Sequence, residues 1–527
     1  MKQTKVILSL ILSLILLLSI PAIGATAEEP EANIKELIIL HTNDTHGRVV
    51  GDSVPGPDGL PREAGIIGFA RYKTMIDAIK KANDDRVLVL DAGDTIHGTN
   101  FATLSKGQSV IRVMNEVGID AMVAGNHEYN YGMKELDDAI KEANFPVLAA
   151  NIVDEKSGEK PLQSHEIFEI DGLKIGVFGI ATPETKVKSS PPNTEGLDFV
   201  DPVKVAAEEV EALKKEGCHA IIMLCHLGID LESVDTSRKV LEEVEGIDLA
   251  VDGHSHTLIE SGEELGSALL VQAGEMFGHV GLVRLKFEDD KLVEKEAQTI
   301  DFKSAAQYQE DPDILEYIAS IEKENERYTK LEVGKTAVHL DGEREDVRTS
   351  ETNLSNLIVD AILWATEADC AISNGGNVRA SIPEGMITMG DLLTVMPFEN
   401  TIIVIEVSGK DIKDALKFGA DAYPGTAGKF PNVANLTYEI VKVDKDKYEV
   451  QNILYQGKEL DDEKIYKLAT NDFLAIGGDG YTMFEDKPQV LLQGLMVDIV
   501  RDYIEYLIAD GEDFEYETDG RIKVVED

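Results

Sequence analysis

The chain has 527 residues, 43% of them hydrophobic, and a mean hydropathy of -0.12, so it can form more than one folded core and is not a disordered protein. It carries 98 acidic against 50 basic residues, and this formal net charge of -48 opposes binding to nucleic acid or to an anionic membrane surface. The three cysteines, Cys218, Cys225 and Cys370, have no spacing typical of a disulfide framework or a zinc ribbon. Any metal site must therefore use histidine, aspartate and asparagine.

The first 27 residues have the pattern of a secretory signal. Lys2 and Lys5 precede an apolar stretch at 6–20, and an Ala-Thr-Ala cleavage pattern occupies 25–27. An uncleaved membrane anchor is the alternative, but the apolar run is short for a bilayer. No later run is long enough to span a membrane. We therefore expect a secreted protein (extracellular, periplasmic or attached to the cell surface), with no stable membrane insertion after cleavage.

Residues 28–309 alternate short β-rich runs with helical patterns. The predicted strands are 34–40, 87–90, 121–124, 174–180, 220–224 and 248–251. The predicted helices are 62–82, 108–117, 133–143, 203–215 and 237–244. This alternation predicts a layered α/β domain.

Residues 310–334 read as a helical linker. Asp311 stands at an N-cap position before Pro312, and a narrow apolar stripe precedes a highly charged segment at 322–326. A second domain over 335–527 follows, with predicted helices 353–366, 410–418 and 495–509 and predicted strands 402–407, 436–440 and 466–470. The pattern alone leaves its class open between α/β and α+β.

Polar residues follow five of the predicted strands at the point where each strand ends. In chain order these fragments are HTNDTHG at 41–47, DAGD at 91–94, GNHE at 125–128, CH at 225–226 and DGHSH at 252–256. Ligands of layered α/β sheets bind beyond the carboxyl ends of the strands. We therefore expect these fragments to meet at one rim.

The side chains at this rim suit divalent metal ions. They offer imidazole nitrogens, carboxylates and one amide oxygen, without thiolates. Each fragment alone is a weak signal, but five in order at strand ends point strongly to a metal site. Seven candidate ligands are too many for one tetrahedral ion and fit two metals that share a carboxylate, as in hydrolytic phosphoryl transfer. The seven are Asp44, His46, Asp94, Asn126, His226, His254 and His256.

These motifs resemble those of the calcineurin-like metallophosphoesterases. Within that group, ILHTNDTHG at 39–47 looks like the opening of the secreted 5′-nucleotidase family, which includes UDP-sugar hydrolases. The resemblance covers nearly the whole mature chain. It implies an α/β protein in which a four-layer α/β/β/α metallophosphoesterase domain is joined by the helical linker to a smaller α/β C-terminal substrate-binding domain.

The resemblance also implies how the ligands divide between two metal ions, such as Zn or Mn. One ion is expected to take Asp44, His46 and His256, and the other Asn126, His226 and His254. Asp94 is expected to bridge them; the residues alone do not separate Asp94 from Asp91, and the Gly-Asp pairing of the family selects Asp94. Asp91, Asp252, His41 and His97 are expected to support the loops or the ligands.

The same resemblance makes His127 a catalytic residue. An imidazole beside the phosphate can stabilise charge on the phosphoryl oxygens or assist the leaving group. The family commonly places an aspartate three residues after this histidine, whereas this chain has Asn130. An amide orients the ring without raising its pKa as a carboxylate does. A different pH optimum is one expected consequence.

The second domain carries motifs that look like substrate-binding signatures of the family. They are ETNLSNL at 351–357, NGGNVR at 374–379, PF at 397–398, NDFLA at 471–475 and GGDG at 477–480. Arg348 and Arg379 are expected to bind phosphate oxygens, and Phe398 and Phe473 to sandwich a base. The remaining polar contacts, with the ribose hydroxyls and the base edge, are assigned to Asp479 and Asn374. The family usually has glycine where this chain has Asn377.

The leading hypothesis is a secreted two-metal 5′-nucleotidase that hydrolyses nucleoside 5′-monophosphates, with no covalent enzyme intermediate. A UDP-sugar hydrolase or a 2′,3′-cyclic-nucleotide phosphodiesterase is the alternative within the same chemistry. The resemblance extends to a manganese-dependent sulfur-oxidation hydrolase, against which the paired phenylalanines and Asp479 argue. The alternative of a different class is a non-catalytic nucleotide-binding module.

Overall fold

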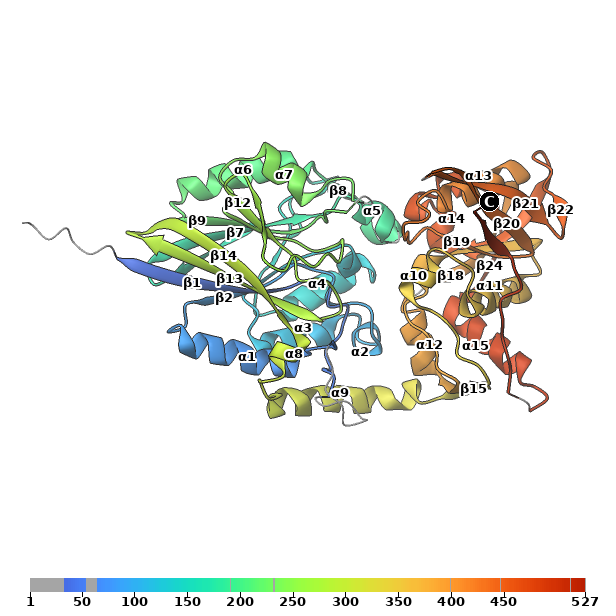
Figure 1. The fold of residues 1–527 in the computed structure, drawn as a ribbon, viewed down its shortest axis with the longest axis horizontal. Coiled ribbons are helices and arrows are strands. Elements are labelled where there is room, and N and C mark those ends of the chain that lie inside the picture. The colour runs from blue at the N-terminus through green and yellow to red at the C-terminus, as the bar shows by residue number, and fades with distance from the viewer. Residues whose placement is uncertain are drawn as a thin grey trace, which may run out of the picture.

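The computed structural model describes residues 33–53, 64–189, 191–230, 233–398, 400–445, 447–511 and 513–526. The predicted signal at 1–27 lies outside these residues. Within the described ranges, no helix combines the length and the apolarity that crossing a bilayer would require. Figure 1 shows two bodies, one built from the N-terminal half of the chain and one from the C-terminal part.

The first body contains two six-stranded mixed sheets. The order of the first sheet is β14-β13-β1-β2-β3-β4, and that of the second is β11-β12-β10-β9-β7-β6. The first comprises β1 (Ile34–Thr42), β2 (Val87–Asp91), β3 (Ala121–Val123), β4 (Val147–Leu148), β13 (His279–Glu288) and β14 (Lys291–Asp301). The second comprises β6 (His165–Ile170), β7 (Leu173–Ala181), β9 (Ala220–His226), β10 (Leu249–Val251), β11 (Glu263–Leu265) and β12 (Ala268–Val271).

Alternating side chains of β1 show why the sheets are buried on both faces. Leu37 and Ile39 pack into the core between the sheets, whereas Ile38 and Leu40 pack against the outer helices. The helices over the first sheet are α1 (Phe69–Ala82), α3 (Gln108–Val117) and α4 (Met133–Glu142). Those over the second are α6 (Pro202–Lys215) and α7 (Ser237–Glu243). The four-layer α/β/β/α arrangement is therefore confirmed.

Helix α9 (Pro312–Thr329) joins the two bodies and runs along the lower edge of Figure 1. Asp311 caps it by accepting hydrogen bonds from the backbone N–H groups of Asp313 and Ile314, and Pro312 is its first residue. Ile314 and Ile318 are buried in the core of the first body. At its other end α9 contacts α12 (Met389–Val395) of the second body.

The second body is centred on a five-stranded mixed sheet of order β19-β16-β23-β18-β24. Its strands are β16 (Cys370–Asn374), β18 (Thr401–Ser408), β19 (Pro431–Ala434), β23 (Ile465–Asn471) and β24 (Gln489–Leu495). One face packs on α11 (Asn353–Thr366), α12 and α15 (Met496–Leu507). The other packs on α13 (Gly409–Gly419) and on a sheet of β20 (Leu436–Asp444), β21 (Lys447–Tyr455), β22 (Lys458–Glu459) and β25 (Ile522–Val525).

Short elements complete the two bodies and contribute several site residues. They are α2 (Asn100–Thr103), α5 (Thr185–Lys188), α8 (Phe302–Ala305), α10 (Arg344–Val347), α14 (Asp472–Ala475), β5 (Ile152–Asp154), β8 (Leu197–Phe199), β15 (Glu332–Thr336) and β17 (Gly385–Thr388). Most predicted elements agree with the structure to within two residues. The helix predicted over 62–82 begins only at Phe69, because residues 64–68 form a loop that ends in Gly68. Gly68 has φ 74°, and a Cβ there would lie 2.3 Å from the backbone nitrogen of Gly51.

Candidate active site

The site lies where β1, β2 and β3 of the first sheet and β9 and β10 of the second sheet end. The first two loops are joined by backbone hydrogen bonds. Asp44 N donates to Gly93 O at 2.9 Å, and His46 N donates to Asp94 O at 2.9 Å. The strand ends meet at one rim, as predicted, and strands of both sheets supply it.

Most of the candidate ligands have an unusual backbone conformation. Five of the seven have positive φ, a region that non-glycine residues rarely adopt. Residues of this kind cluster at functional sites, where the surrounding fold maintains the strain. They are Asp44 (φ 49°), His46 (φ 47°), Asp94 (φ 55°), His254 (φ 74°) and His256 (φ 56°).

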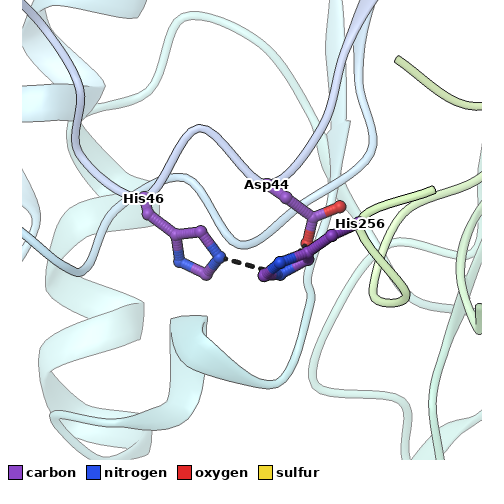
Figure 2. Close-up of side chains that lie close together, drawn as sticks. All are labelled: Asp44, His46 and His256. Carbon is purple, nitrogen blue, oxygen red and sulfur yellow. Dashed lines mark hydrogen bonds and ion pairs between the residues drawn. The ribbon is translucent and has the colours of Figure 1, made fainter. Parts of the chain in front are cut away.

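The first donor set consists of Asp44, His46 and His256 (Figure 2). The Nε2 atoms of the two histidines lie 3.1 Å apart, and His256 Nε2 lies 3.5 Å from Asp44 Oδ1. One ligand atom from each residue lies within 4.8 Å of the others. Three electron-pair donors facing one another at this distance form a cradle for a cation.

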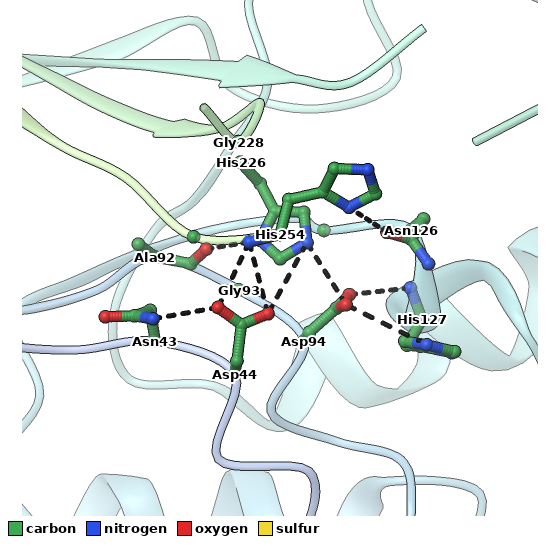
Figure 3. Close-up of polar contacts among 12 residues, drawn as sticks. Asn43, Asp44, Ala92, Gly93, Asp94, Asn126, His127, His226, Gly228 and His254 are labelled. Atoms are coloured by element: carbon green, nitrogen blue, oxygen red, sulfur yellow. Dashed lines mark hydrogen bonds and ion pairs between the residues drawn. The ribbon is translucent and has the colours of Figure 1, made fainter. Parts of the chain in front are cut away.

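The second donor set consists of Asp94, His226 and His254, with Asn126 beside them (Figure 3). His226 Nε2 lies 3.1 Å from Asp94 Oδ2, and His254 Nδ1 lies 2.9 Å from Asn126 Oδ1. Asp94 also groups within 4.8 Å with His46 and His127. Its carboxylate therefore lies within 4.8 Å of donor atoms in both halves of the cluster, the position that a bridging ligand needs.

Two observations show that these residues fit divalent cations. His226 is fully buried, its Nδ1 lies 2.7 Å from Ala92 O, and its Nε2 faces the carboxylates of Asp94, at 3.1 Å, and Asp44, at 3.9 Å. Burial lowers the pKa of His226, but the Asp94 and Asp44 carboxylates outweigh burial and raise it to about 10. The cluster thus combines a buried nitrogen that faces two carboxylates with an electrostatic preference for positive charge.

Outer contacts determine which imidazole nitrogen each histidine can offer a metal. The Ala92 carbonyl accepts from His226 Nδ1, which leaves Nε2 free to bind. His254 Nε2 lies 3.3 Å from Glu184 Oε2, so its Nδ1, beside Asn126, is the nitrogen that is left to bind a metal. His256 resembles His226 and differs from His254, because Glu275 pairs with its Nδ1 and its Nε2 faces the first donor set.

His127 lies at the edge of the cluster. Its backbone N–H donates to Asp94 Oδ1 at 2.8 Å, and its Nε2 lies 3.9 Å from Asp94 Oδ2. Asn130 Nδ2 donates to His127 Nδ1 at 2.6 Å, and Ser189 Oγ donates to Asn130 Oδ1 at 3.3 Å, which orients the amide. The proton of the neutral ring therefore sits on Nε2. Burial lowers the pKa of His127 to about 3, so the ring is neutral at physiological pH.

We predict that Asn130→Asp raises the pKa of His127. A carboxylate beside Nδ1 stabilises the imidazolium form, so the ring becomes protonated at a higher pH than in the wild type. The measurement is an NMR titration of the His127 ring in metal-free protein, with Asn193→Asp as a control. Asn193 lines the same cavity, and its Nδ2 donates to the Asn130 carbonyl oxygen at 2.8 Å. An unchanged pKa in the Asn130 variant would show that this position does not set the protonation state.

Residues from both bodies line one cavity of about 380 Å³. From the metal cluster it is lined by Asp94, Asn126, His254 and His256, together with His127 and Asn130. From the second body all six predicted substrate residues line it, namely Arg348, Asn374, Arg379, Phe398, Phe473 and Asp479. Asp44, His46 and His226 are buried beneath these lining residues.

The substrate residues make specific contacts around the cavity. The Phe398 ring stacks on His97, with centroids 5.0 Å apart, and the Arg379 guanidinium carbon lies 5.9 Å from its centroid. Asn374 Nδ2 donates to Asp479 Oδ2 at 2.7 Å, while Asn377 Nδ2 donates to Asn374 Oδ1 at 2.6 Å. Asn377, where the family usually has glycine, thus fixes the Asn374 side chain. The sandwiching of a base by Phe398 and Phe473 stays a prediction.

Asp91 and Asp252 support loops, as expected. Asp91 accepts hydrogen bonds from the Thr42 and Thr95 hydroxyls at 2.7 and 2.8 Å, and Asp252 accepts from backbone N–H groups of 227, 228 and 253. Glu128 has a similar role that its motif did not reveal. Its carboxylate accepts from the backbone N–H groups of Asp94, Thr95 and Gly125 at 2.7–2.8 Å, and so joins two ligand loops.

Sequence reasoning missed three further site residues, Glu184, Glu275 and Arg344. Glu184 follows β7 by three residues and Glu275 follows β12 by four. The rule that polar residues beyond strand ends build the site would have found both carboxylates if it had been applied to these two strands. Arg344 lies on α10 of the second body, and its Nη1 donates to Glu275 Oε2 at 3.1 Å.

Comparisons with known proteins agree with the fold and the motifs. Residues 37–258 match the calcineurin-like phosphoesterase family, and residues 332–486 match the 5′-nucleotidase C-terminal domain. The chain is 31% identical over 522 residues to the 5′-nucleotidase of Bos taurus, and the match covers 89% of this chain and 88% of that protein. It is 32% identical over 510 residues to the trifunctional nucleotide phosphoesterase protein YfkN of Bacillus subtilis, covering 87% of this chain but only 33% of YfkN.

Among solved structures, the 5′-nucleotidase precursor from Thermus thermophilus matches with a TM-score of 0.80. The two sequences are 30% identical, and the match covers 93% of this chain and 99% of that one. Both domains and their order are thus shared with relatives along most of the length. The chain therefore belongs to the 5′-nucleotidase family, as a two-domain α/β protein with a metallophosphoesterase domain and a C-terminal 5′-nucleotidase domain.

Proposed function

We propose that this protein is a two-metal 5′-nucleotidase that hydrolyses nucleoside 5′-monophosphates to nucleoside and phosphate. One observation carries the proposal: a single cavity is bounded by the metal-donor cluster on one side and by arginine, aromatic and carboxylate side chains of the second domain on the other. A phosphohydrolase needs both parts, because it must hold the phosphoryl group and the leaving nucleoside together.

The donor sets are proposed to hold Zn, Mn or a similar divalent ion each. Asp44, His46 and His256 would hold one, and Asn126, His226 and His254 the other, with Asp94 shared between them. When bound, the two ions supply positive charge to the phosphoryl oxygens and increase the acidity of water. Imidazole, carboxylate and amide ligands accept several such metals, so the supply of metal decides between them.

His127 and the arginines act on the phosphate. The Nε2–H group of His127 is directed to the cluster by Asn130 and would donate a hydrogen bond to a phosphoryl oxygen. Arg348 and Arg379 line the same cavity and would bind the remaining oxygens. Burial lowers the pKa of Arg379 to about 10, so its guanidinium stays charged at neutral pH.

The second domain would bind the nucleoside. Phe398 and Phe473 offer aromatic faces, and stacking tolerates different bases. Asp479, oriented by Asn374, would accept hydrogen bonds from the ribose hydroxyls. Export from the cytoplasm is part of the proposal and rests on the pattern of residues 1–27 alone; amino-terminal sequencing of the mature protein tests it.

We predict that the full chain releases phosphate from AMP only when divalent metal is present. A panel of AMP, a UDP-sugar and a 2′,3′-cyclic nucleotide is assayed before and after treatment with a chelator, and again after Mn²⁺ or Zn²⁺ is added back. AMP is expected to be the preferred substrate, and metal addition is expected to restore the activity. Nucleotide binding without phosphate release under added metal would instead favour a non-catalytic binding protein.

A further inference from the structure

Glu275 lies directly behind His256, on the side away from the other donors. The Glu275 carboxylate is paired with His256 Nδ1, while His256 Nε2 faces His46 Nε2 at 3.1 Å and Asp44 Oδ1 at 3.5 Å. A carboxylate that accepts the Nδ1 proton leaves the Nε2 electron pair directed at the metal, and it fixes the plane of the ring. Glu275 therefore selects the form of His256 that can act as a ligand.

The loop that carries Glu275 is tied to the same donor set. The next residue, Met276, has a positive φ of 55°, and its backbone N–H donates to Asp44 O at 2.8 Å. The Glu275 side chain is about one-third exposed, so packing alone does not hold it. An additional contact is needed to keep its carboxylate against the His256 ring.

Arg344 supplies that contact from the other domain. Its Nη1 donates to Glu275 Oε2 at 3.1 Å, on the oxygen that is paired with His256, and it also lies 2.5 Å from His256 Nδ1 itself. The corresponding carboxylate of the second donor set, Glu184, is held within the first body, because its Oε1 accepts from the backbone N–H of Val234 at 2.6 Å. Thus one metal site has an internal support and the other has a support that crosses between the domains.

We infer that Glu275 is a positioning residue for His256 and that Arg344 holds Glu275 in place. The metal affinity of the Asp44–His46–His256 site then depends on the C-terminal domain lying where α10 can reach Glu275. By linkage, a metal ion at this site favours that same arrangement of the domains. This inference rests on the proposed function, since it assumes that the donor set binds a divalent ion.

The positive charge of Arg344 allows its positioning role to be distinguished from a direct electrostatic effect on the metal ion. A guanidinium near a metal site repels the ion, and one that donates directly to His256 Nδ1 leaves the proton of the neutral ring on Nε2. Removal of Arg344 would therefore strengthen metal binding if its charge or this direct contact alone mattered. If Arg344 acts through Glu275, its removal weakens metal binding. The two accounts therefore predict effects of opposite sign.

The test measures Mn²⁺ binding to the full chain, in the absence of nucleotide, by isothermal titration calorimetry. Wild-type protein is expected to bind two ions. In Glu275→Gln the affinity for one ion is expected to fall by about 10- to 100-fold, the usual effect of losing an outer partner of a ligand. Arg344→Ala is expected to weaken the same ion, and the double variant is expected to bind it no more weakly than Glu275→Gln alone.

Two matched variants serve as controls. Glu345→Gln removes a carboxylate from an exposed position on α10 and is expected to leave both affinities unchanged. Glu184→Gln is expected to weaken the other ion, and adding Arg344→Ala to it should not weaken that ion further. Thermal unfolding of each variant checks that it is folded.

A third comparison isolates the path through the ring. His256→Gln keeps a side-chain oxygen that can bind metal but removes the imidazole, so Glu275→Gln in this background is expected to have no further effect. Unchanged or tighter Mn²⁺ binding in Arg344→Ala would overturn the inference, and so would a further loss on adding Glu275→Gln to His256→Gln. If wild-type protein bound no Mn²⁺ at all, the proposed function itself would fail. If wild-type protein bound two ions and the Glu275→Gln and Arg344→Ala variants bound them with unchanged affinity, only the positioning role would be refuted.

Discussion

Replacing Asp94 by asparagine is expected to remove at least one of the two metal ions and to lower kcat/KM for AMP by about 10³-fold or more. Asp94 groups within 4.8 Å with His226 and His254 on one side and with His46 and His127 on the other. Its Oδ2 lies 3.1 Å from His226 Nε2. A neutral amide cannot supply the shared negative charge that two cations need. Metal content by mass spectrometry and steady-state kinetics measure the effect.

Asp91→Asn is the matched comparison, because Asp91 is equally buried and lies three residues earlier. Its oxygens accept hydrogen bonds from Thr42, Thr95 and Gly93. The Asp91 variant is expected to unfold at a lower temperature while its folded form retains two metal ions. A normal metal content in Asp94→Asn, together with metal loss in Asp91→Asn, would show that Asp91 is the shared metal ligand and that Asp94 supports the loop.

Replacing His127 by alanine is expected to lower kcat by about 10²- to 10⁴-fold, the range for loss of a positioned proton-transfer or hydrogen-bonding group. KM is expected to change little, because the proposed hydrogen bond from Nε2 to the phosphoryl group strengthens as charge develops. The metal ligands remain in place, so metal content should stay at the wild-type value. His219→Ala, which removes a histidine bonded to the Lys174 backbone outside the site, is the control.

Phe473→Ala completes this comparison. Loss of one stacking partner is worth about 1–3 kcal/mol and is expected to raise KM with a smaller effect on kcat. Phe473 lines the cavity, and its ring packs so closely on Gly478 that a Cβ there would lie 2.5 Å from a ring carbon. If both the His127 and the Phe473 variants lost only kcat, the separation of catalytic from binding roles between the domains would be wrong.

The metal cluster was predictable because its signal is local. Each fragment follows a strand whose apolar pattern is readable from a few residues, such as Leu37–Leu40 of β1, with alternate side chains in two cores. Glycines at fixed places in the fragments are also readable. A Cβ on Gly125 would lie 2.4 Å from Asp94 Oδ1, so the glycine of the GNHE motif reflects close packing against a candidate ligand.

The rest of the site depends on contacts that no local pattern records. The β13–β14 hairpin was not predicted, although β13 pairs with β1 and completes the first sheet. Glu275 and Arg344 are 69 residues apart in the chain and meet only because the second domain lies against the first. Phe398 was assigned to the base, yet its observed stacking on His97 arises from the docking of the two domains.

Seven side chains from five loops are proposed to bind a pair of divalent cations. The most direct measurement is the anomalous diffraction of crystals grown with Mn²⁺. The expected result is two peaks, one among Asp44, His46 and His256 and one among Asn126, His226 and His254, with Asp94 in contact with both. A single peak, or peaks away from these residues, would contradict the two-metal site.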